Sequence, residues 1–210
     1  MQWIAPPKIF KKIYPDIFWR KETYKKEIFI TFDDGPTKDL TPWIINTLNN
    51  LSIKATFFCV GENAKKHPEN IALLIKNGHQ IGNHTYSHIN GWRNNKETYL
   101  ADIEKCSEII PKTRLFRPPY GKLNPLHISA IKKKYKIIMW DLLSYDFQKD
   151  MTKEKLKKNV LNNVKNGSII VFHDNKKSKK LLQSSLHEIL IELKNKRFIF
   201  KLFSSNAKEV

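Results

Sequence analysis

Thr31-Phe32-Asp33-Asp34-Gly35-Pro36 ends an apolar run that begins at Glu27. The run predicts a buried β-strand over residues 27–32, which Gly35-Pro36 ends. Successive side chains at a strand end project in different directions, so one carboxylate can bind a metal while its neighbour faces the reacting water. Asp-Asp-Gly-Pro is equally typical of a turn. The other polar residues of the chain decide between these two interpretations.

Strand-like and helix-like segments alternate along the rest of the chain. Helix starts are indicated at Thr41-Pro42 and Asn124-Pro125, and helix ends at Asn77-Gly78 and Asn166-Gly167. Seven strands and six helices in regular alternation predict one α/β domain with parallel strands covered by helices. A barrel and an open doubly wound sheet both fit this pattern. The six further strands are predicted at residues 55–60, 79–82, 114–117, 136–140, 168–173 and 198–203.

Composition bounds the class of protein. The 210 residues are 40% hydrophobic, which excludes a disordered chain and fits one domain with a large core. The net charge is +18, yet only five residues are arginine, so we predict no nucleic-acid partner. A basic surface would still attract an anionic membrane or cell-wall surface. Cys59 and Cys106 lie in apolar periodic segments and are expected to pack as small hydrophobic residues.

The leader, residues 1–26, precedes the predicted domain at 27–203, and residues 204–210 form a tail. The leader lacks the apolar core and cleavage site of a signal peptide, and no run is apolar enough for a transmembrane helix, which favours a cytoplasmic or membrane-peripheral location. Nine large apolar residues lie among the first 19. We expect them to pack on the domain, and a membrane-surface anchor is the alternative.

Polar residues follow the predicted strands at five places. Because parallel α/β folds place active sites at the carboxyl ends of their strands, we expect these groups to meet at one edge. The groups are Asp33-Asp34, His84 with His88, Arg117-Pro118-Pro119-Tyr120-Gly121, Asp141 with Asp146, and His173-Asp174.

His84 and His88 are the best candidates for metal ligands. Their spacing is one helical turn, and a tight turn would also bring both rings to one cation. Adding one carboxylate gives two histidines and an acid, which leaves positions open for water and substrate. Three other histidines lie in predicted helices without partners and are expected to be surface or packing residues, namely His67, His127 and His187.

Hydrolysis also needs a base for water and an acid for the leaving group. Asp33 is available as the base once Asp34 is on the metal, and Arg117 can keep Asp33 ionised and aimed. His173 is the best acid, because an imidazolium can protonate an amine near neutral pH. Asp146 or Asp174 could hold His173 charged, but we favour Asp174 as a helix N-cap.

Together these segments resemble the polysaccharide deacetylases, the NodB-homology domain of carbohydrate esterase family four. The resemblance spans residues 27 to about 203 and keeps all five family motifs in order. It implies a distorted (β/α) barrel and metal-dependent removal of N-acetyl groups from acetylamino sugars, with release of acetate. The segments are Thr31-Phe32-Asp33-Asp34-Gly35, His84-Thr85-Tyr86-Ser87-His88, Arg117-Pro118-Pro119-Tyr120-Gly121, Trp140 to Phe147 and Val171-Phe172-His173.

The resemblance also implies roles for the ligands and the base. Asp34, His84 and His88 would hold one divalent metal, most simply Zn²⁺, with Co²⁺, Mn²⁺ or Ni²⁺ as other candidates. Asp33 would be the base, oriented by Arg117.

The remaining implied roles concern the acid and the substrate. His173 would be the acid, tuned by Asp146, and the backbone N–H of Tyr120 would help to hold the oxyanion. Trp140 and Val171 would wall the pocket for the acetyl methyl group, and the stiff Pro118-Pro119 turn would position the substrate.

Two positions of the fourth motif depart from the family pattern. Leu143 replaces the usual first Asp, and Phe147 replaces the usual groove Trp. The tuning carboxylate, Asp146, is kept. These changes are expected to alter the shape of the substrate groove more than the chemistry.

Three other functions compete with N-deacetylation. The same site could hydrolyse an O-acetyl ester or a non-sugar amide. A non-catalytic glycan-binding module is disfavoured, because the acid, the base and the metal ligands are all present. Nucleic-acid binding would rest on charge alone.

Overall fold

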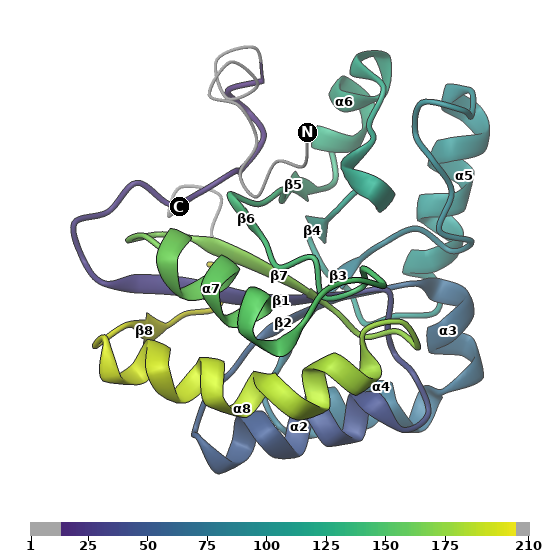
Figure 1. Ribbon diagram of the computed structural model, residues 1–210. Coiled ribbons are helices and arrows are strands. Elements are labelled where there is room, and N and C mark those ends of the chain that lie inside the picture. The colour runs from purple at the N-terminus through teal and green to yellow at the C-terminus, as the bar shows by residue number, and fades with distance from the viewer. Residues whose placement is uncertain (1–13, 205–210) are drawn as a thin grey trace.

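The computed structural model describes residues 14–204 and shows a curled parallel sheet surrounded by helices (Figure 1). Seven strands lie in the order β5-β4-β3-β2-β1-β7-β6, and β8 (Ile199–Phe200) pairs with the start of β1. Within residues 14–204, the paired strands all run parallel to one another. The seven strands are β1 (Glu27–Asp33), β2 (Thr56–Cys59), β3 (Gln80–Asn83), β4 (Leu115–Phe116), β5 (Lys136–Ile137), β6 (Leu142–Leu143) and β7 (Ile169–His173).

Helices cover the outer face of this sheet (Figure 1). They are α2 (Leu40–Asn50), α3 (Gly61–Lys66), α4 (Pro68–Lys76), α5 (Lys96–Ser107), α6 (Pro125–Lys132), α7 (Lys153–Asn163) and α8 (Lys179–Asn195), with a short 3₁₀ turn at Pro119–Gly121. None of the helices in residues 14–204 is long and apolar enough to span a membrane. The predicted fold, a distorted barrel of about seven parallel strands, is confirmed.

Side-chain alternation along β1 separates the two faces of the sheet. Ile28, Ile30 and Phe32 lie in the core beneath the helices. Phe29 lies in the barrel interior with Phe58, Ile138, Ile169 and Phe203. Because side chains alternate along a strand, Thr31 and Asp33 share the face of Phe29. The first acid of the pair therefore belongs to the barrel interior.

The barrel has a seam, because the strand order runs from β5 to β6 without joining them in the described chain. Phe18 lies at the β5 side of this seam. Its N–H donates to Ile137 O at 2.9 Å, and its carbonyl accepts from the N–H of Met139 at 2.7 Å. Its ring stands edge-on to Phe203, which stacks on Phe29 at the base of the barrel.

Deleting residues 1–19 is expected to lower the melting temperature more than deleting residues 1–13. The difference isolates residues 14–19, where Ile17 is buried beside Tyr135 and Ile137. Losing one such side chain costs about 2 kcal/mol, or roughly 4 °C or more for a domain of this size. Thermal melts of both variants measure it. Equal melting temperatures, with lost binding to anionic vesicles, would favour a membrane anchor instead.

Residues 1–13 and 205–210 lie outside the described residues, so the division into leader, domain and tail stays a prediction.

The seven predicted strands appear at the expected places, and two further elements do not follow from the sequence pattern. Strand β6 has two residues and begins five positions after the end of β5. It follows the apolar run at 136–140 so closely that the sequence does not indicate a separate strand. Helix α3 is a short segment before Pro68 and was not predicted. Thr41 is also not the N-cap of its helix, because α2 begins at Leu40 with Asp39 in the cap position.

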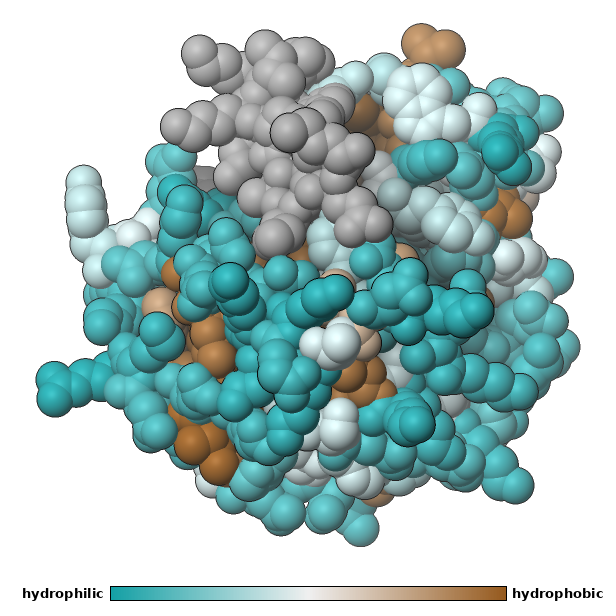
Figure 2. Space-filling view, viewed as in Figure 1, coloured by the Kyte–Doolittle hydropathy of each residue, from teal (hydrophilic) through white to brown (hydrophobic). Residues whose placement is uncertain are grey.

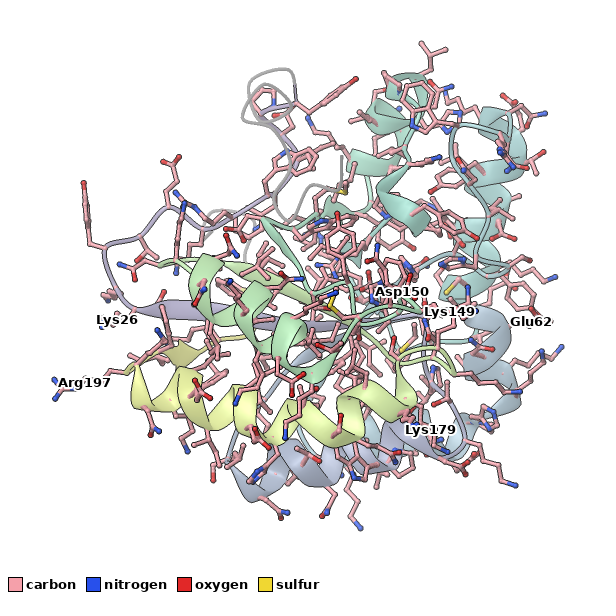
Figure 3. The ribbon with its side chains drawn as sticks, viewed as in Figure 1. Lys26, Glu62, Lys149, Asp150, Lys179 and Arg197 are labelled. Carbon is pink, nitrogen blue, oxygen red and sulfur yellow. The ribbon has the colours of Figure 1, made fainter. Side chains whose placement is uncertain are left out.

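The described surface is strongly polar. Hydrophilic residues dominate the face in Figure 2, with small scattered hydrophobic areas. Charged side chains, including Arg197 and Glu62 at opposite edges, lie around the periphery of the ribbon in Figure 3. Cys59 and Cys106 are buried and unpaired, as the sequence predicts.

Candidate active site

The two acids diverge at the end of β1. Asp33 is the last strand residue and lies opposite His173 of β7 in the parallel register. Asp34 follows with φ 76°, which takes its side chain away from that of Asp33. Asn63 donates to the backbone oxygen of Asp34 at 2.7 Å and holds this left-handed residue. The strand-end interpretation of Asp-Asp-Gly-Pro therefore holds.

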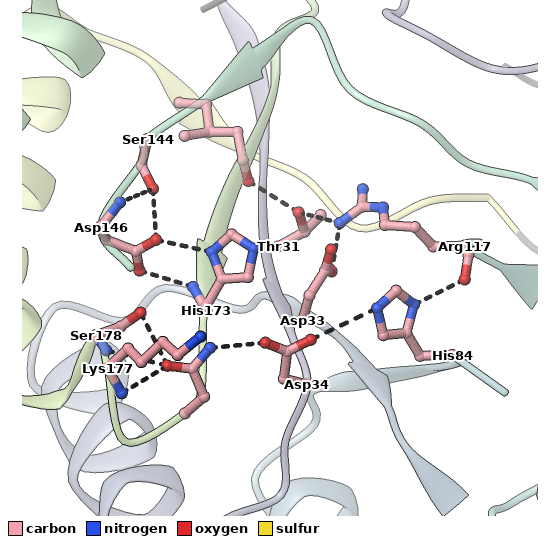
Figure 4. Close-up of polar contacts among 12 residues, drawn as sticks. Thr31, Asp33, Asp34, His84, Arg117, Ser144, Asp146, His173, Lys177 and Ser178 are labelled. Atoms are coloured by element: carbon pink, nitrogen blue, oxygen red, sulfur yellow. Dashed lines mark hydrogen bonds and ion pairs between the residues drawn. The ribbon is translucent and has the colours of Figure 1, made fainter. Parts of the chain in front are cut away.

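Arg117 binds Asp33 inside the barrel. Its Nη1 donates to Asp33 Oδ1 and to Thr31 Oγ1, both at 2.7 Å (Figure 4). Nε and Nη2 donate to the backbone oxygens of Ile138 and Met139 at 3.0 and 2.9 Å. The guanidinium is fully buried, so these contacts fix its plane and aim the Asp33 carboxylate.

His84 and His88 lie on a loop after β3, not on a helix. Thr85 and His88 have φ of 64° and 54°, which turn both rings toward Asp34. Nδ1 of His84 lies 2.7 Å from the backbone oxygen of Arg117. A carbonyl only accepts, so Nδ1 carries the proton and donates. Burial lowers the pKa of His84 to about 4, so the ring is neutral near pH 7 and Nε2 offers a lone pair.

His88 completes a group of three donor atoms around Asp34. Nε2 of His88 and Nε2 of His84 lie 3.1 and 3.7 Å from Asp34 Oδ1. The opposite nitrogen of His88, Nδ1, lies 3.1 Å from the hydroxyl of Tyr120. One ligand atom from each of the three residues lies within 4.8 Å of the others, so the group could hold a metal ion. Two imidazoles with outer partners and one carboxylate fit a zinc-type cation.

Asp34 is held in its ionised form. Burial opposes its charge, but the hydrogen bond from His88 and the charges of the neighbouring histidines hold the pKa of Asp34 well below its usual range. The carboxylate is therefore ready to accept a cation.

His173 ends β7 and is held by Asp146. Nδ1 of His173 lies 2.7 Å from Asp146 Oδ1, and the backbone N–H of His173 donates to Oδ2 at 2.8 Å (Figure 4). The hydroxyl of Ser144 donates to the same Oδ1 at 2.9 Å. Burial disfavours the imidazolium, but the Asp146 carboxylate outweighs burial and raises the pKa of His173 to about 9. The ring of Phe147, the residue in place of the family's Trp, stands edge-on to His173 at 4.6 Å.

Asp174 has a different place from either expectation. The N-cap of α8 is Ser178, and the carboxylate that holds His173 is that of Asp146. The carboxylate of Asp174 instead accepts hydrogen bonds from the hydroxyls of Thr37 and Thr41. It packs so closely beneath Gly35 that an added Cβ there would lie 2.3 Å from Asp174 Oδ2. Asp174 thus anchors the loop that follows the paired acids.

The residues expected to contact substrate surround the same edge. Pro118 and Pro119 are buried, whereas Tyr120 is 62% exposed with φ 61°. Trp140 packs against Gly121, where an added Cβ would lie 2.5 Å from the indole ring. Val171 is fully buried opposite Thr31. Their part in an acetyl pocket stays a prediction.

One polar residue at this edge has no role in the sequence-based prediction, and one residue predicted to lie there does not. Asp141, expected at the edge with Asp146, lies instead at the start of β7, level with Phe29 of β1. Asn175 donates to Asp34 Oδ2 at 2.7 Å. Asp141 accepts from the hydroxyl of Ser168 and the N–H of Ile169 and so fastens the start of β7. Asn175 lies 141 positions from Asp34, so no local pattern could pair them.

Fold and site together define a class. Proteins of this class have a parallel α/β barrel. At the carboxyl edge of its strands lies an Asp-His-His group between an Asp-Arg pair and a His-Asp pair. The family model described as "Polysaccharide deacetylase" matches residues 20–136. The chain therefore belongs to the polysaccharide deacetylase family, and the predicted family is confirmed.

Individual relatives agree with this assignment. A peptidoglycan-N-acetylglucosamine deacetylase of Bacillus cereus is 37% identical over 155 residues, which cover 71% of this chain and 56% of the relative. This chain thus corresponds to little more than half of that protein. A second Bacillus cereus protein of the same name is 30% identical over 192 residues, covering 88% of this chain and 89% of the relative.

A solved structure agrees as well. The Bc1960 peptidoglycan N-acetylglucosamine deacetylase, in complex with 4-naphthalen-1-yl-N-oxidanyl-benzamide, has a TM-score of 0.86 at 32% identity. The match covers 93% of this chain and 94% of that one. The fold of this chain therefore matches that solved structure over nearly the whole length of both chains.

Proposed function

We propose that the protein removes N-acetyl groups from acetylamino sugars of a glycan by metal-dependent hydrolysis, with peptidoglycan as the first substrate to test. The observation that carries this proposal is the Asp34, His84 and His88 group, whose ligand atoms lie within 4.8 Å of one another. A candidate base and a candidate acid flank it. The two Bacillus cereus relatives, named as peptidoglycan-N-acetylglucosamine deacetylases, support the choice of substrate.

Asp34, His84 and His88 would hold one divalent cation, for which Zn²⁺ is the first candidate. When bound, such a cation polarises the acetyl carbonyl and makes a neighbouring water more acidic. Asp33 accepts the proton of the attacking water, and Arg117, 2.7 Å from its carboxylate, holds it in place. The backbone N–H of Tyr120 is the candidate donor to the oxyanion.

His173 completes the reaction as the acid. Its imidazolium gives a proton to the amide nitrogen as the carbon–nitrogen bond breaks, so the products are acetate and a free amino sugar. An amine needs this proton to leave, whereas an alcohol needs it less. The Asp146 carboxylate 2.7 Å from Nδ1 therefore favours an amide over an O-acetyl ester as the substrate.

Chelation is expected to abolish acetate release from peptidoglycan fragments, and one equivalent of Zn²⁺ is expected to restore it. The reason is that the chain supplies three ligands for a cation, and chelation removes the charge that would polarise the acetyl carbonyl. Acetate release and metal content, measured together, test this result, and Co²⁺, Mn²⁺ and Ni²⁺ identify the preferred metal.

His88→Ala is the variant for this test, with His187→Ala as the matched control outside the site. His88→Ala should lose the bound metal and the activity, and His187→Ala should keep both. Full activity after chelation, or metal bound equally by His88→Ala, would refute the metal site.

A further inference from the structure

Three consecutive residues at the end of β7, from His173 to Asn175, lie against the segment that carries the paired acids. The N–H of Asp174 donates to Asp33 O at 2.8 Å, and its carboxylate holds Thr37 and Thr41. His173 lies opposite Asp33. Asn175 reaches the side chain of Asp34, where Nδ2 donates to Oδ2 at 2.7 Å. Asn175 takes no part in the proposed reaction.

The amide of Asn175 can take only one orientation. Its Oδ1 accepts from the backbone N–H groups of Lys177 and Ser178 at 2.9 and 3.0 Å. Two backbone donors require an oxygen at that position, so the NH₂ group must face Asp34. The turn before α8 thus presents a fixed donor to one oxygen of the carboxylate.

The two oxygens of Asp34 are therefore divided between different partners. Oδ1 faces His88 Nε2 at 3.1 Å and His84 Nε2 at 3.7 Å, on the side where a cation would lie. Oδ2 is occupied by Asn175. A carboxylate that is free at both oxygens can rotate or bind a cation through both, whereas here Oδ1 faces the two histidines and Oδ2 is tied to Asn175.

We propose that Asn175 is a positioning residue for the metal, which reserves Oδ1 of Asp34 for the cation and keeps this ligand to one oxygen. The inference rests on the metal site of the proposed function. Ligation through one oxygen leaves more of the coordination sphere for water and the acetyl oxygen. Partners that orient a ligand from outside typically change metal affinity by about 10- to 100-fold when removed.

Asn175→Ala is expected to weaken Zn²⁺ binding about tenfold or more, measured by competition with a chromophoric chelator. The absorption spectrum of the Co²⁺-loaded variant should also change, because Asp34 gains freedom to ligate through both oxygens. Asn63→Ala is the matched control. Asn63 also donates an amide hydrogen bond of 2.7 Å to Asp34, but to its backbone oxygen. The Asn63→Ala variant should change the Zn²⁺ affinity less than Asn175→Ala and keep the Co²⁺ spectrum of the unmodified protein.

Asn175→Asp provides a second variant that keeps an acceptor for Lys177 and Ser178. It places a second negative charge against Asp34, so the metal-free protein should melt at a lower temperature. A cation would relieve this repulsion, and Zn²⁺ should raise its melting temperature more than that of the unmodified protein. In Asn175→Ala the rise should be smaller, because the affinity is lower.

The outcomes separate this inference from the proposed function. If Asp34→Ala still binds the metal, the proposed site itself is wrong. If Asp34→Ala loses the metal while Asn175→Ala matches the unmodified protein in affinity and Co²⁺ spectrum, only the role of Asn175 is wrong. Equal weakening by Asn175→Ala and Asn63→Ala would also overturn it, since general ordering of the loop would then explain both.

Discussion

Asp33→Asn is expected to cut the turnover of an acetylated glycan by about a hundredfold or more while leaving Zn²⁺ affinity unchanged. The amide keeps the shape of the carboxylate and an oxygen for Arg117, whose Nη1 lies 2.7 Å from Oδ1. It cannot take a proton from water, however. Asp34, which would hold the cation, is untouched. Acetate-release kinetics and chelator competition on the same preparation measure both quantities.

A near-normal rate in Asp33→Asn would remove Asp33 from the role of base. Loss of metal together with activity would instead place Asp33 among the ligands. Glu62→Gln, which changes an exposed acid on α3, serves as the control for a simple loss of charge and should keep both rate and affinity.

The pH dependence of turnover is expected to be bell-shaped, with a basic limb that reports the His173–Asp146 pair. His173 must be protonated when the amine leaves, so the rate is sustained below its pKa and falls as the pH rises through it. Burial opposes the imidazolium, but the Asp146 charge raises the pKa of His173 to about 9. A cation on Asp34 would offset part of this rise, so we expect the limb between the ordinary value of about 6.5 and about 9.

Asp146→Asn should move this limb toward lower pH, because it removes the charge that favours the imidazolium. Asp141→Asn is a close control, since Asp141 is also a buried acid that accepts from a hydroxyl and a backbone N–H but does not hold His173. It should leave the limb in place. His173→Ala should reduce turnover of amides by about a hundredfold or more and of activated esters much less. Equal losses on both substrates would make His173 a structural residue or a metal ligand.

The sequence predicts the edge where the candidate site lies because alternation and strand ends are local signals. Parallel strands bring their carboxyl ends together, so residues after β1, β3, β4 and β7 meet without further information. The partners of Asp174 could not be predicted. Thr37 and Thr41 lie 137 and 133 positions away, and the fold alone brings them beneath Gly35.

The histidine pair shows a second limit of local patterns. Spacing of four positions fits a helix or a tight turn equally well, and left-handed backbone at Thr85 and His88 decides for the loop. Neither is a glycine, so the sequence carries no sign of this conformation. Strand β6 could not be predicted for a related reason, since its two residues follow the apolar run at 136–140 too closely to show a pattern of their own.

The aromatic cluster of Phe18, Phe29 and Phe203 bears on how the molecule can be attached to a surface. These rings lie at the base of the barrel, whereas the paired acids end β1 at the opposite rim. The chain segments at Phe18 and Phe203 thus lie at the same end of the barrel, opposite the candidate active site. A linker joined to the segment preceding Phe18 or to the one following Phe203 would leave the rim with Asp33 and His173 facing outward. A bead-bound or wall-bound form held in this way would present its candidate catalytic rim to a polymer too large to diffuse.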